Sequence, residues 1–139
     1  MFGHSFVKRL ETFCRENEQH NLNLDLEKFA VAFCGIGGLC MEKVKSHLDN
    51  EIRRISPDII ILEIGANDLD RAFNRGHNIR FVAADVVEFA NQALWKTRLV
   101  YVLPAYHRSN TWLDIYEDLL PTFNFTIRYI CRGLQNAYY

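Results

Sequence analysis

The stretch Pro57–Asp68, P-D-I-I-I-L-E-I-G-A-N-D, decides the fold that the rest of the sequence predicts. The isoleucines and leucine between Ile59 and Ile64 leave almost no polar alternation, which is typical of a parallel strand covered by helices on both faces. Gly65 then lets the backbone turn without steric cost, so we expect Asn67 and Asp68 to emerge at the carboxyl end of the sheet. In open α/β sheets, ligands bind at that end.

Helix and strand patterns alternate along the remainder of the chain. Apolar residues at helical spacing predict helices over residues 5–19, 39–56, 78–95 and 111–132. Asn78 is the expected N-cap of the third helix, Pro121 is expected to bend or divide the fourth, and Gly133 is placed to end it. Strands are expected at 29–34, 58–64 and 99–103, all in the sheet interior, and a further strand begins at 136–139. Residues 70–77 are expected to be irregular.

This order predicts an α/β fold, a three-layer α/β/α sandwich around a central parallel sheet. Only Met1 and Phe2 precede the Gly3-His4-Ser5 turn, so we expect the first strand to be incomplete. The final strand has barely begun at 136–139, so we also expect the C-terminal segment to be incomplete. An exposed sheet edge would then favour self-association. With 139 residues, 49% of them hydrophobic, residues 1–139 are expected to form a single domain.

Charge and cysteine content exclude several classes of function. The 16 basic and 17 acidic residues give no field that would favour nucleic acid or an anionic membrane. No apolar run approaches the roughly 20 residues that cross a bilayer, and we expect a cytoplasmic protein. The cysteines show no C-x-x-C spacing, so we expect reduced core residues, with no zinc site and no cofactor: Cys14, Cys34, Cys40 and Cys131.

Polar and glycine-rich turns follow three of the expected strands. Ser5 begins a helix directly after a Gly-His turn, where its hydroxyl is exposed and its N–H lies at the positive end of the helix dipole. The run Gly35-Ile36-Gly37-Gly38 offers backbone N–H groups beside a second helix start, and Asn67 offers a side-chain amide. Three donors that converge on one point form an oxyanion hole, and Ser5 is the candidate nucleophile.

These motifs, in this order, resemble the SGNH hydrolase family, also called GDSL-type esterases, over nearly the whole chain. Gly3-His4-Ser5 stands for the family's Gly-Asp-Ser, and Gly65-Ala66-Asn67 for its Gly-x-Asn block. The resemblance implies a flavodoxin-like SGNH fold and hydrolysis of small-molecule esters. It also implies that Ser5 is the nucleophile and that the Ser5 N–H, the Gly38 N–H and the Asn67 amide hold the oxyanion.

Two departures from the family predict impaired activity. His4 replaces the usual aspartate, and no aspartate precedes any histidine by three residues, so the family's Asp-x-x-His block has no match. A serine without a base is a poor nucleophile at neutral pH. His107, after the 99–103 strand, is the one other candidate base, and we expect His4 and His107 to be surface loop residues.

Other functions stay open from the sequence alone. A non-catalytic binding or assembly module could keep the same pocket. The run G-I-G-G-L-C lacks the third glycine of a dinucleotide fingerprint, and neither Glu63 nor Asp68 is well placed to hold a ribose. A flavodoxin-like phosphate site also fits this architecture, since fold alone does not decide function.

Overall fold

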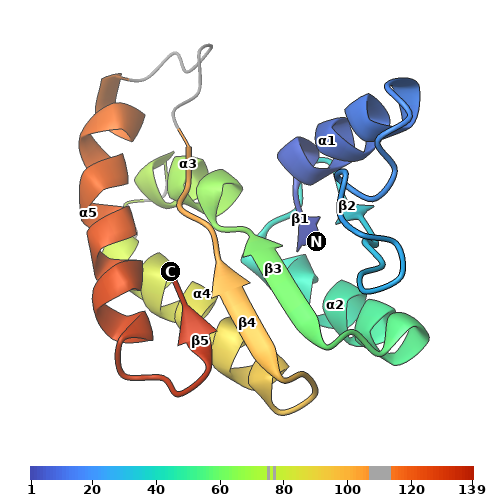
Figure 1. Ribbon diagram of the computed structural model, residues 1–139. Coiled ribbons are helices and arrows are strands. Elements are labelled where there is room, and N and C mark those ends of the chain that lie inside the picture. Colours follow the sequence, from blue (N-terminus) through green and yellow to red (C-terminus); the bar gives the residue numbers. More distant parts are fainter. Residues whose placement is uncertain (75, 77, 107–113) are drawn as a thin grey trace.

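The computed structural model describes residues 1–74, 76, 78–106 and 114–139. One five-stranded sheet runs through the molecule in the order β2-β1-β3-β4-β5, and every neighbouring pair is parallel (Figure 1). The strands are β1 (Phe2–Gly3), β2 (Cys34–Gly35), β3 (Ile59–Glu63), β4 (Leu99–Val102) and β5 (Ala137–Tyr138). The predicted parallel α/β architecture is therefore confirmed.

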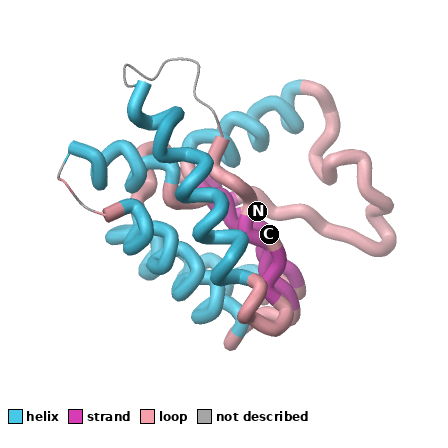
Figure 2. Tube along the Cα trace, turned by 90° about the vertical axis from the view of Figure 1, so that its left-hand side faces the viewer, coloured by secondary structure: helices cyan, strands magenta, loops and turns pink. Residues whose placement is uncertain are grey.

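The helices lie on both faces of the sheet. They are α1 (Ser5–Glu16), α2 (Met41–Ile55), α3 (Ala66–Asn74), α4 (Ile79–Leu94) and α5 (Asp114–Cys131). Figures 1 and 2 show α2 to α5 on one face, and α1 with the 17–33 segment on the other. The core lies between the sheet and the larger helical layer, where Leu62, Val100 and Phe123 are fully buried.

The elements predicted most closely, β3, β4 and the start of α4, have strong local sequence patterns. Strand β3 pairs with β4 from Ile59 opposite Leu99 to Leu62 opposite Val102, so two β-branched runs form the centre of the sheet. The N-cap prediction for α4 is confirmed, because the Asn78 side chain accepts a hydrogen bond from the Arg80 N–H at 2.9 Å.

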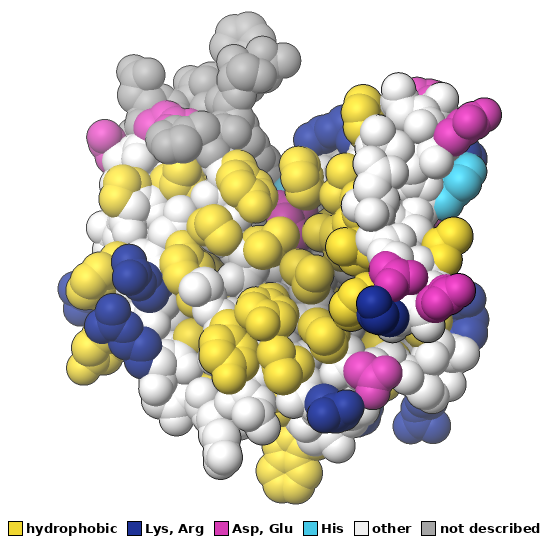
Figure 3. Space-filling view, viewed as in Figure 1, with side chains coloured by type: hydrophobic (Ala, Val, Ile, Leu, Met, Phe, Trp, Pro, Cys, Tyr) yellow, Lys and Arg dark blue, Asp and Glu magenta, His cyan; other side chains and the backbone are white. Residues whose placement is uncertain are grey.

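The expectation that helices cover both faces of β3 is wrong. Ile60 and Leu62 are buried against the helices, whereas the side chain of Ile59 on the opposite face is 48% exposed. Tyr101 and Tyr138 are also exposed, and Figure 3 shows hydrophobic side chains gathered across this front face. The cause is the position of α1, which packs on β1 and β2. Among the described residues it leaves the start of β3 exposed on that side, whereas Glu63, at the end of the strand, is buried against His4.

The interior strand expected at 29–34 is also wrong. Only Cys34 and Gly35 form β2, and this strand lies at the edge of the sheet. Its neighbour in the sheet is the two-residue β1. Backbone bonds run from Cys34 N to Met1 O, from Ile36 N to Gly3 O and from the amino group of Met1 to Ala32 O. Upstream, the Val31 N–H bonds to the Asn21 side chain at 2.8 Å instead of to a strand.

Two further corrections concern helices. The stretch expected to be irregular begins inside α3, whose buried residues Ala66, Leu69 and Ala72 follow a three-residue spacing. Helix α5 continues through Pro121, so the proline does not divide the last helix, and the alternative of a bend stays a prediction.

Three further predictions concern the cysteines, membrane-spanning helices and self-association. The expected core position is found for Cys14, Cys40 and Cys131, whereas Cys34 is only half-buried. Among the described residues, no helix is long and apolar enough to cross a membrane. Self-association through a sheet edge stays a prediction; the two edge strands, β2 and β5, are each two residues long, and short edges offer little backbone for pairing.

Candidate functional site

The three turns singled out in the sequence lie at one edge of the sheet. Strands β2, β1 and β3 are parallel neighbours, so their carboxyl ends adjoin. Ser5 is the first residue of α1 after β1, Gly38 lies in the loop between β2 and α2, and Asn67 is in the first turn of α3 after β3. The topology therefore brings the three predicted site residues to the same end of three adjacent strands.

Ser5 and Gly38 offer donors without competing partners. The Ser5 side chain is half-buried, and Gly38 is exposed with a left-handed φ of 68°. Within the described part of the chain, no hydrogen bond is found for the Ser5 hydroxyl or for the backbone N–H groups of Ser5 and Gly38. Because first-turn N–H groups have no intrahelical acceptor, the Ser5 N–H is available to an anionic group.

Asn67 has a structural contact that the sequence did not reveal. Its amide Nδ2 donates to the Leu39 carbonyl at 2.7 Å, so it ties the start of α3 to the loop that carries Gly38. The bond therefore fixes the glycine loop and the Asn67 side chain relative to each other.

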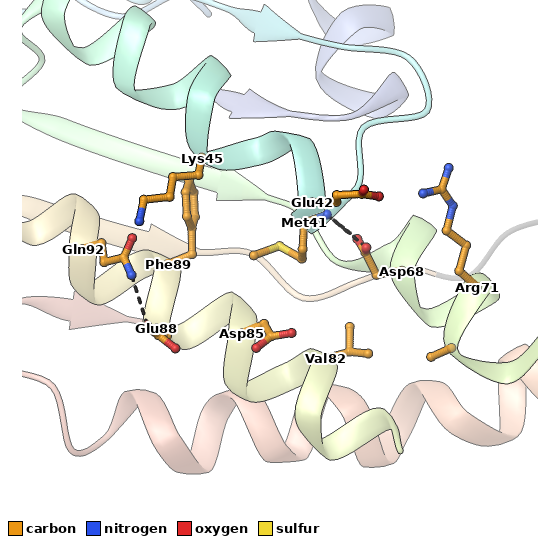
Figure 4. A pocket seen from close by; sticks show the side chains of 11 residues that line it. Met41, Glu42, Lys45, Asp68, Arg71, Val82, Asp85, Glu88, Phe89 and Gln92 are labelled. Atoms are coloured by element: carbon orange, nitrogen blue, oxygen red, sulfur yellow. Dashed lines mark hydrogen bonds between the residues drawn. The ribbon is translucent and has the colours of Figure 1, made fainter. Parts of the chain in front are cut away.

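Asp68 and Arg71 strengthen the same link. Both carboxylate oxygens of Asp68 accept from the Met41 N–H, at 3.0 and 3.1 Å, and so cap α2, whose own N-cap residue, Cys40, makes no side-chain cap bond (Figure 4). The Arg71 Nη1 donates to Cys40 Sγ at 2.9 Å. Burial raises the pKa of the Asp68 carboxyl, against the opposing effects of the Met41 bond and of Arg71. Helix α3 thus holds the N-terminus of α2.

His4 is not a surface loop residue, which corrects the expectation from sequence. Its side chain is 5% exposed, and the ring Nε2 lies 2.7 Å from Oε1 of Glu63, whose side chain is 2% exposed. The ring Nδ1 accepts the Phe6 N–H at 3.5 Å, so His4 serves as the N-cap of α1. Both ring nitrogens therefore face groups other than the Ser5 hydroxyl.

Glu63 and Tyr106 are the neighbours that the sequence analysis missed. The rings of Phe6 and Tyr106 stand 5.4 Å apart, so the loop after β4 reaches across to the start of α1. Burial, together with the negative charge of Glu63, raises the pKa of the Tyr106 phenol. The sequence signal that could have indicated this contact is Glu63, an acidic residue in an otherwise aliphatic strand.

A base for Ser5 is not found among the described residues. His107 lies outside them, and His4 is engaged with Phe6 and Glu63. No group of three or more His, Cys, Asp or Glu side chains in the described part of the chain could hold a metal ion. The arrangement thus supplies a hydroxyl and anion-binding donors but leaves proton removal unassigned.

A separate cleft of about 430 Å³ lies on the helical side of the sheet, between α2, α3 and α4 (Figure 4). Its lining combines the acidic residues Glu42, Asp68, Asp85 and Glu88 with the basic residues Lys45 and Arg71. It includes none of the three predicted site residues.

Comparison with known proteins gives likeness in structure only. Neither a protein-family profile nor a curated protein sequence matches the chain. The structure of Axe2, an acetylxylan esterase from Geobacillus stearothermophilus, superposes with a TM-score of 0.62 at 13% identity, over 93% of this chain and 57% of that one. The chain therefore shares the α/β fold of this esterase.

Two mutant structures of the same enzyme match this chain to a similar extent. A variant described as an acetyl-xylooligosaccharide esterase gives a TM-score of 0.62 at 14% identity, over 92% of this chain and 57% of that chain. A catalytic mutant gives 0.60 at 15% identity, over 74% and 50%. The chain thus spans little more than half the length of these enzymes, and at this identity the likeness extends to the fold alone.

Proposed function

We propose that this chain carries an SGNH-type ester hydrolase site in which Ser5 is the nucleophile and in which activity is impaired by the lack of a placed base. The observation that carries the proposal is the meeting of three donor-bearing turns at the carboxyl ends of β2, β1 and β3. The fold shared with acetylxylan esterases supports a small carboxylic ester as the substrate class.

The proposed chemistry is acyl transfer to Ser5. The Ser5 Oγ attacks the ester carbonyl carbon, its proton passes to a base, and the carbonyl oxygen becomes an oxyanion. The N–H groups of Ser5 and Gly38 and the Asn67 amide stabilise that oxyanion. When the tetrahedral intermediate collapses, the alcohol leaves with the proton from the base, and water then releases the acid from Ser5.

Hydrolysis of p-nitrophenyl acetate, with and without added imidazole, tests the proposal. Loss of the base in a serine triad costs several orders of magnitude in rate, so we expect the wild-type chain alone to differ little from Ser5→Ala. Imidazole supplies a base from solution, and we expect it to produce a rate component in the wild type that Ser5→Ala lacks. Ser46→Ala, which alters an exposed serine of α2, is the matched control.

Two outcomes would change this conclusion. Strong Ser5-dependent turnover without imidazole would show that the chain contains its own base, and His107→Ala would then test the one candidate outside the described residues. No Ser5-dependent component with imidazole present would remove the hydrolase site and favour a non-catalytic binding module.

A further inference from the structure

A buried acid–imidazole pair lies directly behind the turn that delivers Ser5. Gly3 pairs with Glu63 in the β1–β3 register, and the His4 N–H donates to the Glu63 carbonyl at 3.3 Å. The two side chains then meet at 2.7 Å, between His4 Nε2 and Glu63 Oε1, with almost no exposure to solvent. The turn between β1 and α1 is thus bound to β3 through both backbone and side chains.

The contacts of His4 determine the protonation of its ring. Nδ1 accepts the Phe6 N–H, so in the neutral ring the proton is on Nε2, which faces the Glu63 carboxyl group. The 2.7 Å approach is close, but within the described residues neither His4 Nε2 nor Glu63 Oε2 has a partner in hydrogen-bond geometry.

Such a pair contributes little to stability. Desolvation of a buried acid and its partner can exceed their mutual attraction, particularly where hydrogen bonds are incomplete. An apolar pair of similar volume would serve packing as well. Stabilisation of the core therefore does not explain the presence of this pair.

We propose that Glu63 and His4 are positioning residues for Ser5. This inference rests on the proposed function. Glu63 fixes the imidazole of His4, and the imidazole holds the first turn of α1 through the Phe6 N–H. The Ser5 hydroxyl and N–H are thereby presented at the sheet edge. The pair also explains histidine at position 4, since an aspartate there would place a second carboxylate against Glu63.

Reaction of Ser5 with a fluorophosphonate probe in imidazole buffer measures this positioning. Misplacing a reactive group by about 1 Å can cost up to about a hundredfold in rate, so we expect Glu63→Ala to lower the labelling rate by about tenfold or more. Glu63→Gln keeps the size of the side chain and a polar oxygen beside Nε2, and should lose less. Glu11→Gln, which changes an exposed residue of α1, is the control and should label as the wild type does.

Moving the carboxylate from position 63 to position 4 gives a second, independent test. His4→Asp should lower the labelling rate, and His4→Asp combined with Glu63→Gln should restore much of it, because a glutamine amide can donate to the new carboxylate. Circular dichroism shows which variants fold, and Glu63→Met replaces Glu63→Ala if the latter does not. Labelling at the wild-type rate in both Glu63→Ala (or its replacement) and His4→Asp would overturn the proposal.

Nitrogen-15 spectra of the His4 ring separate failure of this inference from failure of the proposed function. We expect the wild-type chain to show the Nε2–H tautomer and Glu63→Ala to lose that preference. An Nδ1–H tautomer in the wild type would overturn the positioning role. Absent labelling of wild-type Ser5, together with an Nε2–H tautomer, would reject the hydrolase site while leaving the imidazole held as described.

Discussion

Replacing Asp68 separates a hydrogen bond from a buried charge. The Asp68 carboxylate caps α2 through the Met41 N–H, while its burial disfavours the charged form and raises its pKa. Asp68→Ala removes the cap, which costs about 1 kcal/mol, in the range of about 0.5–2 kcal/mol. For a chain of this size, that loss lowers the melting temperature by about 3–5 °C. Asp68→Asn keeps an oxygen acceptor for Met41 and removes the charge, so we expect it to equal or exceed the wild type in stability at neutral pH.

The same pair of variants predicts a pH dependence. A carboxyl with a raised pKa binds its proton more tightly in the folded chain than in the unfolded chain. Its contribution is therefore fully present below the unfolded pKa and is lost as the pH rises through the folded pKa. Asp68→Asn should thus gain stability relative to the wild type between about pH 3 and about pH 7.

Urea unfolding followed by far-ultraviolet circular dichroism, repeated across this pH range, provides the measurement. Equal losses in Asp68→Asn and Asp68→Ala at neutral pH would refute the reasoning, because they would show that the charge stabilises the fold. A stability difference between Asp68→Asn and the wild type that does not change with pH would equally contradict the raised pKa.

Two further pairs of variants test the packing behind the site. A Cβ added at Gly35 would lie 2.5 Å from the Lys8 Cα and closer still to its backbone nitrogen, so Gly35→Ala should cost about 1–3 kcal/mol or more in urea unfolding; Gly37→Ala meets nothing within 4 Å and should cost little, and equal losses would contradict this packing. Phe123 is fully buried at 0% exposure, so Phe123→Ala should lower the free energy of unfolding by about 3–5 kcal/mol. Phe125→Ala, at a 69% exposed position of the same helix, should stay within about 0.5 kcal/mol, and a smaller loss at Phe123 would place the core elsewhere.

The parts of the fold that the sequence predicted are those with strong local patterns. Strand β4 and helices α2 and α4 follow from β-branched runs and from helical spacing. Helix α3 was missed because Asn67 and Asp68 are residues typical of turns. In the structure Asn67 donates to the loop ahead of α2, and Asp68 accepts from the first residue of α2. The length of β2 is set by its two-residue partner β1, and that is a non-local limit which the 29–34 run does not contain.

Part of the candidate site could also be predicted from the sequence, and part could not. The common edge of Ser5, Gly38 and Asn67 follows from parallel strands, so sequence order and turn motifs suffice to predict it. The burial of His4 against Glu63 depends on the pairing of Gly3 with Glu63, which requires the strand order and register. Neighbouring residues in the chain could not reveal a contact between positions so far apart.

The open front face of the sheet affects how this protein can be studied. Ile59, Tyr101 and Tyr138 present an apolar surface in the native fold, on strands whose opposite face is packed. Dyes such as ANS, which fluoresce on exposed hydrophobic surface, are commonly used to detect loosely packed intermediates. Here a fully folded chain already offers them a binding surface, so dye fluorescence would report unfolding where none has occurred. Near-ultraviolet dichroism or the protection of backbone amides from hydrogen exchange distinguishes the two states.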